Sequence, residues 1–181
     1  MILKTRLILP LCLIWVAACT APSSDLNSPD VLKASDKDIT IRMQQSTCFG
    51  NCPSYIVKMS GDGTVQFCGL YSTLVKGPKA KQIDPEPIHD LLDNMIAQGF
   101  FEFEDIYKGR IPDSQGATVS VTHGGDTKTV INASGGTRDM PDAVKTIAND
   151  IRRVADIEAW IGPRESRPSR NQIERPDCGF E

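Results

Sequence analysis

Apolar and polar residues alternate in short stretches of the chain, which is the pattern of a β-strand with one buried face. Residues 39–43 alternate in this way, and so do residues 55–59. A Gly-Asp-Gly sequence at 61–63 then precedes another alternating stretch at 64–68. Because glycine supplies the backbone conformations of a tight turn, the pattern predicts a strand at 39–43 and a β-hairpin over 55–69.

The period of the pattern then changes from that of a strand to that of a helix. Apolar residues at positions 88, 91, 92, 95 and 96 are three or four residues apart and form one stripe. Asp84 and Pro85 suit the start of this helix, and Gly99 suits its end. The stripe therefore predicts an amphipathic helix, preceded by a further strand at 71–76.

A second hairpin and a second helix are expected in the last third of the chain. Residues 119–122 alternate, a Gly-Gly-Asp turn follows, and Val130 and Ile131 return along the partner strand. A helical stripe begins near Pro141 and ends by Ile161.

This order of elements predicts an α+β fold, in which two helices pack on one face of an antiparallel sheet of about five or six strands. The other face of such a sheet is half-solvated and carries the polar members of each alternating strand. We expect these members to be Arg42, Lys58, Gln66, Ser120 and Thr122.

The N-terminus has the pattern of an export signal. Lys4 and Arg6 precede an apolar run at residues 7–16, which is shorter than the roughly 20 residues of a membrane-spanning helix. The run Val16-Ala17-Ala18-Cys19 resembles the lipobox of bacterial lipoproteins. That resemblance implies cleavage after residue 18, lipid on Cys19 and, because Thr20 is not Asp, an outer-membrane location facing the periplasm. A plain secretory signal is the alternative.

Cleavage leaves 163 of the 181 residues and changes the formal net charge from −3 to −5. Such a chain has no basic excess for nucleic acid, so we expect none as a partner. Residues 19–37 are rich in Ser, Pro and Asp and are expected to be a flexible tether. A single domain at 38–162 and an extended tail at 163–181 complete the expected organisation.

Four cysteines remain beyond the lipidated residue, namely Cys48, Cys52, Cys68 and Cys178. In an oxidising compartment they imply two disulfides, with three possible pairings. We expect Cys48–Cys52, because a turn brings residues four apart within disulfide range. We expect Cys68–Cys178, because the charged tail is short of apolar residues and needs a covalent attachment to the body. Strand parity places Cys68 on the face without helices, so the tail is expected to cross that face.

Three chemistries compete for Cys48 and Cys52. A structural staple is one. Thiol redox is another, although oxidoreductases usually carry C-x-x-C at a helix start, whereas this spacing is one longer and a strand pattern follows. Copper binding is the third, because CFGNCP resembles the C-x-x-x-C-P motif of the Sco copper-chaperone family. That resemblance implies a distant histidine, for which His123 is the candidate, and a thioredoxin fold with a helix after the motif.

No nucleophile elbow, phosphate-binding loop or zinc-protease motif occurs in the sequence, so we expect neither an enzyme nor a cofactor. The segments CFGNCPSY at 48–55 and GDGTV at 61–65, together with DIY at 105–107, resemble an uncharacterised domain family of bacterial lipoproteins and secreted proteins. The resemblance covers about residues 38–160 and brings no activity with it.

The function expected from these features is binding or scaffolding by a lipid-anchored envelope protein. Contact would be made through the uncovered sheet face or the loop around Cys48 and Pro53, and an envelope protein is the expected partner. A periplasmic copper- or thiol-handling protein is the alternative.

Overall fold

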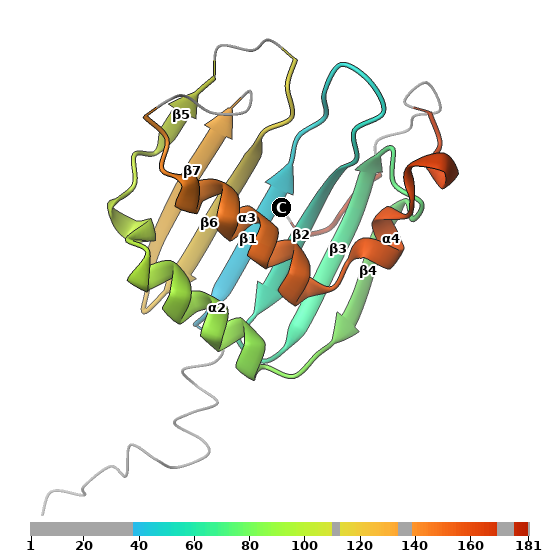
Figure 1. Cartoon of the computed structure of the whole chain (residues 1–181). Helices are drawn as coiled ribbons and strands as arrows, with labels where there is room; N and C mark the ends of the chain where they lie inside the picture. Colours follow the sequence, from blue (N-terminus) through green and yellow to red (C-terminus); the bar gives the residue numbers. More distant parts are fainter. Residues whose placement is uncertain (1–37, 110–112, 134–138, 170–175, 181) are drawn as a thin grey trace, which may run out of the picture.

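The computed structural model describes residues 38–109, 113–133, 139–169 and 176–180. These residues form one sheet of seven strands in the order β4-β3-β2-β1-β6-β7-β5, with the helices on one of its faces (Figure 1). The α+β class expected from the sequence is confirmed, and the strand count is higher than expected.

The strands alternate with turns over the first half of the chain and with helices over the second half. Their bounds are β1 (Thr40–Gln45), β2 (Ser54–Ser60), β3 (Thr64–Tyr71), β4 (Gly77–Gln82), β5 (Ile106–Lys108), β6 (Ala117–His123) and β7 (Asp126–Ala133). The helices are α2 (Glu86–Ala97), α3 (Asp142–Ala155) and α4 (Glu158–Ile161), and two short 3₁₀ turns lie at η1 (Phe100–Glu102) and η2 (Arg164–Ser166).

Neighbouring strands pair antiparallel from β4 across to β7. The prediction of a strand at 71–76 is wrong, because the edge strand β4 is formed by the next residues, Gly77–Gln82. The three-residue strand β5 was not expected, and it pairs with β7 in parallel. Both strands lie at the edges of the sheet, where a buried apolar face is not required and the alternating pattern is therefore weak.

The second expected helix is divided in two. Helix α3 ends at Ala155, because Asp156 adopts a left-handed conformation with φ of 46°. The single turn of α4 follows after Ile157. The described residues therefore contain three helices rather than the two predicted.

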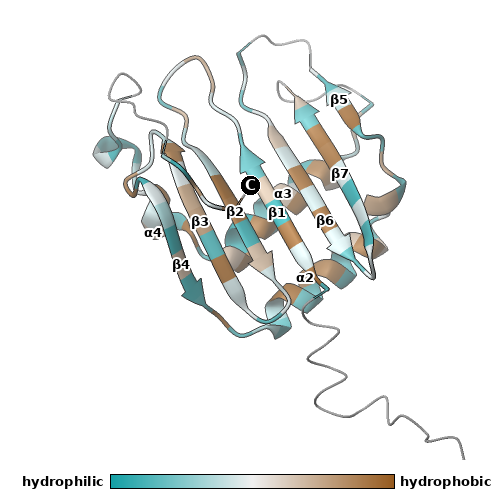
Figure 2. Cartoon of the chain, turned by 180° about the vertical axis from the view of Figure 1, so that it is seen from behind, coloured by the Kyte–Doolittle hydropathy of each residue, from teal (hydrophilic) through white to brown (hydrophobic). Residues whose placement is uncertain are grey.

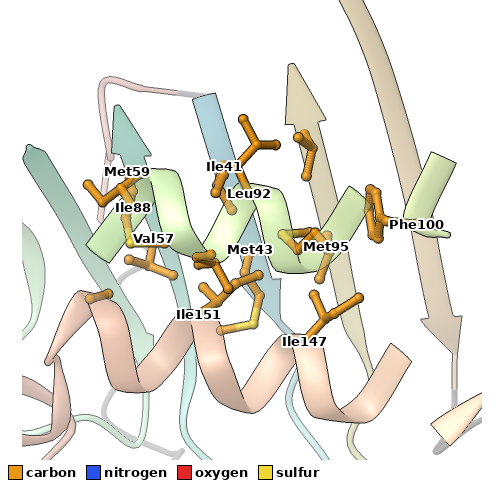
Figure 3. Close-up of a cluster of buried hydrophobic side chains, with 14 of the residues drawn as sticks. Ile41, Met43, Val57, Met59, Ile88, Leu92, Met95, Phe100, Ile147 and Ile151 are labelled. Atoms are coloured by element: carbon orange, nitrogen blue, oxygen red, sulfur yellow. The ribbon is translucent and has the colours of Figure 1, made fainter. Parts of the chain in front are cut away.

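The core lies between the helices and one face of the sheet (Figure 3). Ile41 and Met43 of β1 are completely buried there, as are Val57 and Met59 of β2. Each such side chain contributes roughly 1.5–3 kcal/mol of burial free energy. The helices contribute buried stripes, which are Ile88, Leu91, Leu92 and Met95 from α2 and Val144, Ile147, Ile151 and Ala155 from α3. The prediction that Ile96 belongs to the first stripe is wrong, because its side chain is 44% exposed at the end of α2.

The opposite face of the sheet is not covered by a helix (Figure 2). Tail residues 176–180 lie on it, where Cys178 is joined to Cys68 of β3. A small second cluster forms around this pair with Ile56 and Leu70, and Phe180 packs against it.

The signal, lipobox and tether proposed for residues 1–37 lie outside the described residues. Within the described ranges, no helix has the length and apolarity that a membrane crossing requires.

Candidate functional site

The loop that joins β1 to β2 contains both cysteines of the CFGNCP motif. It begins after Gln45 and ends at Ser54, at the end of the sheet where the longer connections gather (Figure 1). The hydroxyl of Ser54 donates a hydrogen bond of 2.9 Å to the carbonyl oxygen of Gln45, so the two strands close the base of the loop.

The structure places Cys48 and Cys52 at disulfide distance, with Cα atoms 5.6 Å apart. Gly50 lies between them at φ of 139°, a conformation that side-chain-bearing residues rarely adopt. Pro53 then leads into β2, where it takes no place in the strand ladder. A strand therefore follows the motif, as the sequence pattern predicted.

A second segment, residues 113–116, holds this loop in place. The backbone N–H of Ser46 donates to the carbonyl oxygen of Gly116 at 2.9 Å, and the N–H of Gly116 donates to the hydroxyl of Ser46 at 2.8 Å. The side-chain amide of Gln115 bridges both ends of the loop by donating to the carbonyl oxygens of Ser46 and Pro53, at 3.0 and 2.7 Å. The loop is therefore held by its own disulfide and by hydrogen bonds with residues 113–116.

Phe49 is the most exposed large apolar residue in the described chain, with 89% of its surface accessible. Its backbone N–H donates to the carbonyl oxygen of Asp113 at 2.9 Å, so the main chain beneath the ring is anchored. Sequence reasoning singled out the loop but not this side chain, because an aromatic residue between two cysteines is equally compatible with the core.

A hollow of about 320 Å³ lies beside the loop. Residues from β1, β6 and β7 line it, and these include Gln44, Thr118 and Asn132. The side-chain carbonyl oxygen of Asn132 is buried without a hydrogen-bond partner among the described residues. All the lining side chains are uncharged.

His123 lies at the opposite end of the sheet from the two cysteines. It follows Thr122, which pairs with Thr40 at the start of β1, whereas the cysteines follow Gln45 at its end. The length of β1 separates these ends by at least about 17 Å. The copper set Cys48, Cys52 and His123 is therefore not brought together, and nowhere in the described chain do three or more His, Cys, Asp or Glu side chains form a group that could hold a metal.

The other histidine has a structural contact. Nε2 of His89, on α2, lies 2.9 Å from the carbonyl oxygen of Gly61, in the turn between β2 and β3. This places His89 at the turn end of the sheet, away from the disulfide loop.

Tyr55 ends the motif and points into the core, where it is completely buried. Its ring lies 5.6 Å from that of Phe67, which lies 5.4 Å from that of Trp160. Burial raises the pKa of Tyr55 to about 12, although the nearby Arg152 guanidinium acts in the opposite direction. The aromatic side chains at positions 49 and 55 therefore face different surroundings, solvent and core.

The second cysteine pair connects the tail to the sheet. Cys68 and Cys178 lie at disulfide distance with Cα atoms 5.7 Å apart, and both are buried. This is the pairing expected from the sequence. The lipidation site expected at Cys19 lies outside the described residues.

Comparison with known proteins gives one family and no activity. A family model described as a domain of unknown function, DUF6438, matches residues 39–155. No curated protein matches the chain. The match spans the whole sheet and extends to the end of α3.

Proposed function

The chain belongs to the DUF6438 family of unknown function, and from its disulfide loop and the lipobox resemblance we propose that it is a lipid-anchored binding module of the bacterial cell envelope. In this proposal, Phe49 on the disulfide loop is the anchor residue that enters an apolar pocket of a protein partner.

The observation that supports this role is the exposure of Phe49 on a fixed loop. An exposed phenylalanine forgoes roughly 1.5–3 kcal/mol of burial free energy. A partner that covers the ring recovers this free energy, and the fixed loop loses little conformational entropy on binding. Buried aromatic side chains in well-packed pockets commonly supply much of the binding free energy of protein interfaces.

The proposed lipid anchor fits the position of the loop. Residue 38 precedes β1 at the turn end of the sheet, and Phe49 lies beyond its other end. A lipid on Cys19 would therefore hold the domain by the end opposite to Phe49, leaving the loop directed away from the membrane. The lipobox resemblance supports Cys19 as the modified residue and the outer membrane as the location.

Site-specific photo-crosslinking in living cells tests the proposal. A photoreactive phenylalanine analogue is placed at Phe49 and, as a matched control, at Ile106, which is 50% exposed on β5. We expect a discrete crosslinked partner from position 49 and none of the same mass from position 106. The variant Phe49→Ser should remove the partner from affinity purifications and change the free energy of unfolding by less than about 0.5 kcal/mol, because the side chain is exposed.

Two results would contradict the proposal. One is the absence of a discrete species from position 49, or the same species from both positions. The other is evidence for the copper or thiol alternative, in which Cys48 and Cys52 are readily reduced by mild reductant, or retain stoichiometric copper only while His123 is present. Mass mapping under non-reducing conditions and metal analysis distinguish these outcomes.

A further inference from the structure

A polar row crosses the centre of the uncovered sheet face. Arg42 of β1 is directly opposite Lys58 of β2 on one side and Ser120 of β6 on the other. The row continues from Lys58 to Gln66 of β3 and from Ser120 to Thr129 of β7. Adjacent strands are about 4.8 Å apart, so five side chains with hydrogen-bonding groups span about 19 Å across this face.

A second row, made only of hydroxyl side chains, lies next to it. Thr40 pairs with Ser60 on one side and with Thr122 on the other, and Thr122 pairs with Thr127. The hydroxyls of Thr122 and Thr127 lie 2.9 Å apart. Hydroxyl side chains therefore border Arg42 and Lys58 on one side, and Gln44 and the buried Ile56 are the next outward pair on the other side.

The two cations have no carboxylate partner in the part of the chain that the structure describes. Nη2 of Arg42 makes only a long contact of 3.4 Å with Oε1 of Gln44, and its Nε is buried without a partner among the same residues. The nearest part of the described tail carries one carboxylate, Asp177, which forms no ion pair with Arg42 or Lys58 and instead accepts a hydrogen bond from the backbone N–H of Gly179. Two like charges directly opposite each other on a sheet destabilise it, and a bound anion would remove that repulsion.

We propose that the Arg42–Lys58 row binds an acidic segment of another protein, with the two cations holding one of its carboxylates. Arginine binds a carboxylate through two parallel N–H donors, and lysine adds a flexible charged donor beside it. This site goes beyond the Phe49 contact and rests on different residues.

The remaining features of this face favour an acidic peptide over a glycan or a lipid surface. Two aromatic rings are described on this face, Tyr71 of β3 and Phe180 of the tail. Both pack against the Cys68–Cys178 cluster and are partly buried, so neither is a fully exposed platform for a sugar ring. Ile56 and Leu70 are buried beside Cys178, so their apolar surface is not available to acyl chains. A row of polar groups across this face suits an extended, hydrogen-bonding chain.

Fluorescence anisotropy with a labelled oligo-glutamate peptide tests this proposal on the full chain in non-ionic detergent. The variant Arg42→Gln/Lys58→Gln removes both cations. The variant Lys79→Gln/Lys108→Gln removes the same total charge from two exposed lysines of the edge strands β4 and β5. We expect the first variant to weaken peptide binding by at least about tenfold and the second by less than about twofold. Thermal unfolding of all three proteins establishes that each is folded.

Each other outcome overturns the proposal. Absence of peptide binding by the unaltered protein rejects the site. Equal weakening in both variants shows a general charge effect. Displacement of the peptide by phosphatidylglycerol in the micelles, together with lipid binding that needs Arg42 and Lys58, assigns the row to a membrane surface instead. Because neither variant alters Phe49, its photo-crosslink tests the proposed function separately.

Discussion

Phe49 and Tyr55 illustrate how a few residues of chain direct two aromatic side chains to opposite surroundings. Tyr55 is on the inward side of β2, with Val57 and Met59, and its ring contacts Phe67 in the core. Phe49 precedes the strand, in a loop whose conformation depends on Gly50 and a disulfide. The alternating pattern of β2 could therefore predict the burial of Tyr55, whereas no periodicity governs the exposure of Phe49.

At the residue scale, the buried hydroxyl of Tyr55 predicts a loss of stability in alkali. Burial raises the pKa of the folded phenol from 10.0 to about 12. Above pH 10 the unfolded chain releases this proton first, so the contribution of Tyr55 to folding stability falls between about pH 10 and 12 and does not change with pH below that range. The difference of two pH units corresponds to about 3 kcal/mol. Urea unfolding of the unaltered chain and of Tyr55→Phe across this pH range measures the loss of folding stability that Tyr55 causes.

The Tyr55→Phe variant should lack this additional alkaline loss. At pH 7 it should change the free energy of unfolding by less than about 1 kcal/mol, because the described residues provide the hydroxyl with no hydrogen-bond partner of normal geometry. Parallel pH profiles for the two proteins would contradict the assignment to Tyr55.

At the scale of elements, the sequence predicted the central strands better than the edge strands. β1 buries every second residue, and β2 buries Tyr55, Val57 and Met59 on the core side, so both carry apolar residues with period two. Ile56 of β2 departs from the pattern because it is buried on the opposite face, against the tail. β4 carries Pro78, Lys79 and Lys81 and has only one buried position, so its sequence resembles a loop. The three residues of β5 are too few to display a period. Edge position and short length therefore explain the two missed strands.

The candidate site was predictable in part for a similar reason. The spacing of Cys48 and Cys52 and the glycine between them predicted a closed loop, and strand parity predicted the uncovered face that contains Arg42 and Lys58. The two hydrogen bonds that the side-chain amide of Gln115 donates to the loop could not be predicted, because they join residues more than sixty positions apart. Such contacts depend on the pairing of β1 with β6, which the local pattern does not specify.

The two disulfides should differ in their effect on stability. Cys68–Cys178 has a sequence separation of 110 and joins the tail to β3, whereas Cys48–Cys52 has a separation of 4. In the chain-entropy model, closure of the longer loop contributes about 5 kcal/mol and closure of the shorter one about 2 kcal/mol. Urea unfolding of Cys68→Ser/Cys178→Ser should therefore show the larger loss, compared with Cys48→Ser/Cys52→Ser. An equal or smaller loss for the long-range pair would contradict this expectation.

At the scale of the whole molecule, the charges are unevenly distributed between the two faces. Arg42 and Lys58 lie on the uncovered face, where the described strand positions carry no Asp or Glu. The helices on the other face carry six acidic side chains against three basic ones, which leaves them net negative by three charges. The acidic residues are Glu86, Asp90, Asp93, Asp142, Asp150 and Glu158, and the basic residues are Lys145, Arg152 and Arg153. A net-negative protein can therefore present a locally positive surface to an acidic partner, while its helical side repels the same partner.

The proposed tether makes a prediction at this same scale. A flexible chain of the length of residues 20–37 has a typical reach of about 23 Å, and the eight residues of β3 extend about 27 Å. Together these lengths determine how far from the membrane Phe49 can meet a partner. Deletion of residues 22–35 should draw the domain close to the membrane, shorten this distance and so reduce photo-crosslinking from Phe49 in cells. Membrane retention through Cys19, thermal stability and oligo-glutamate binding should remain unchanged, because the folded domain and the lipid site are intact. A Gly-Ser segment of the deleted length should restore the crosslink, whereas Cys19→Ala should abolish membrane retention. An undiminished crosslink after the deletion would show that tether length does not determine access to the partner.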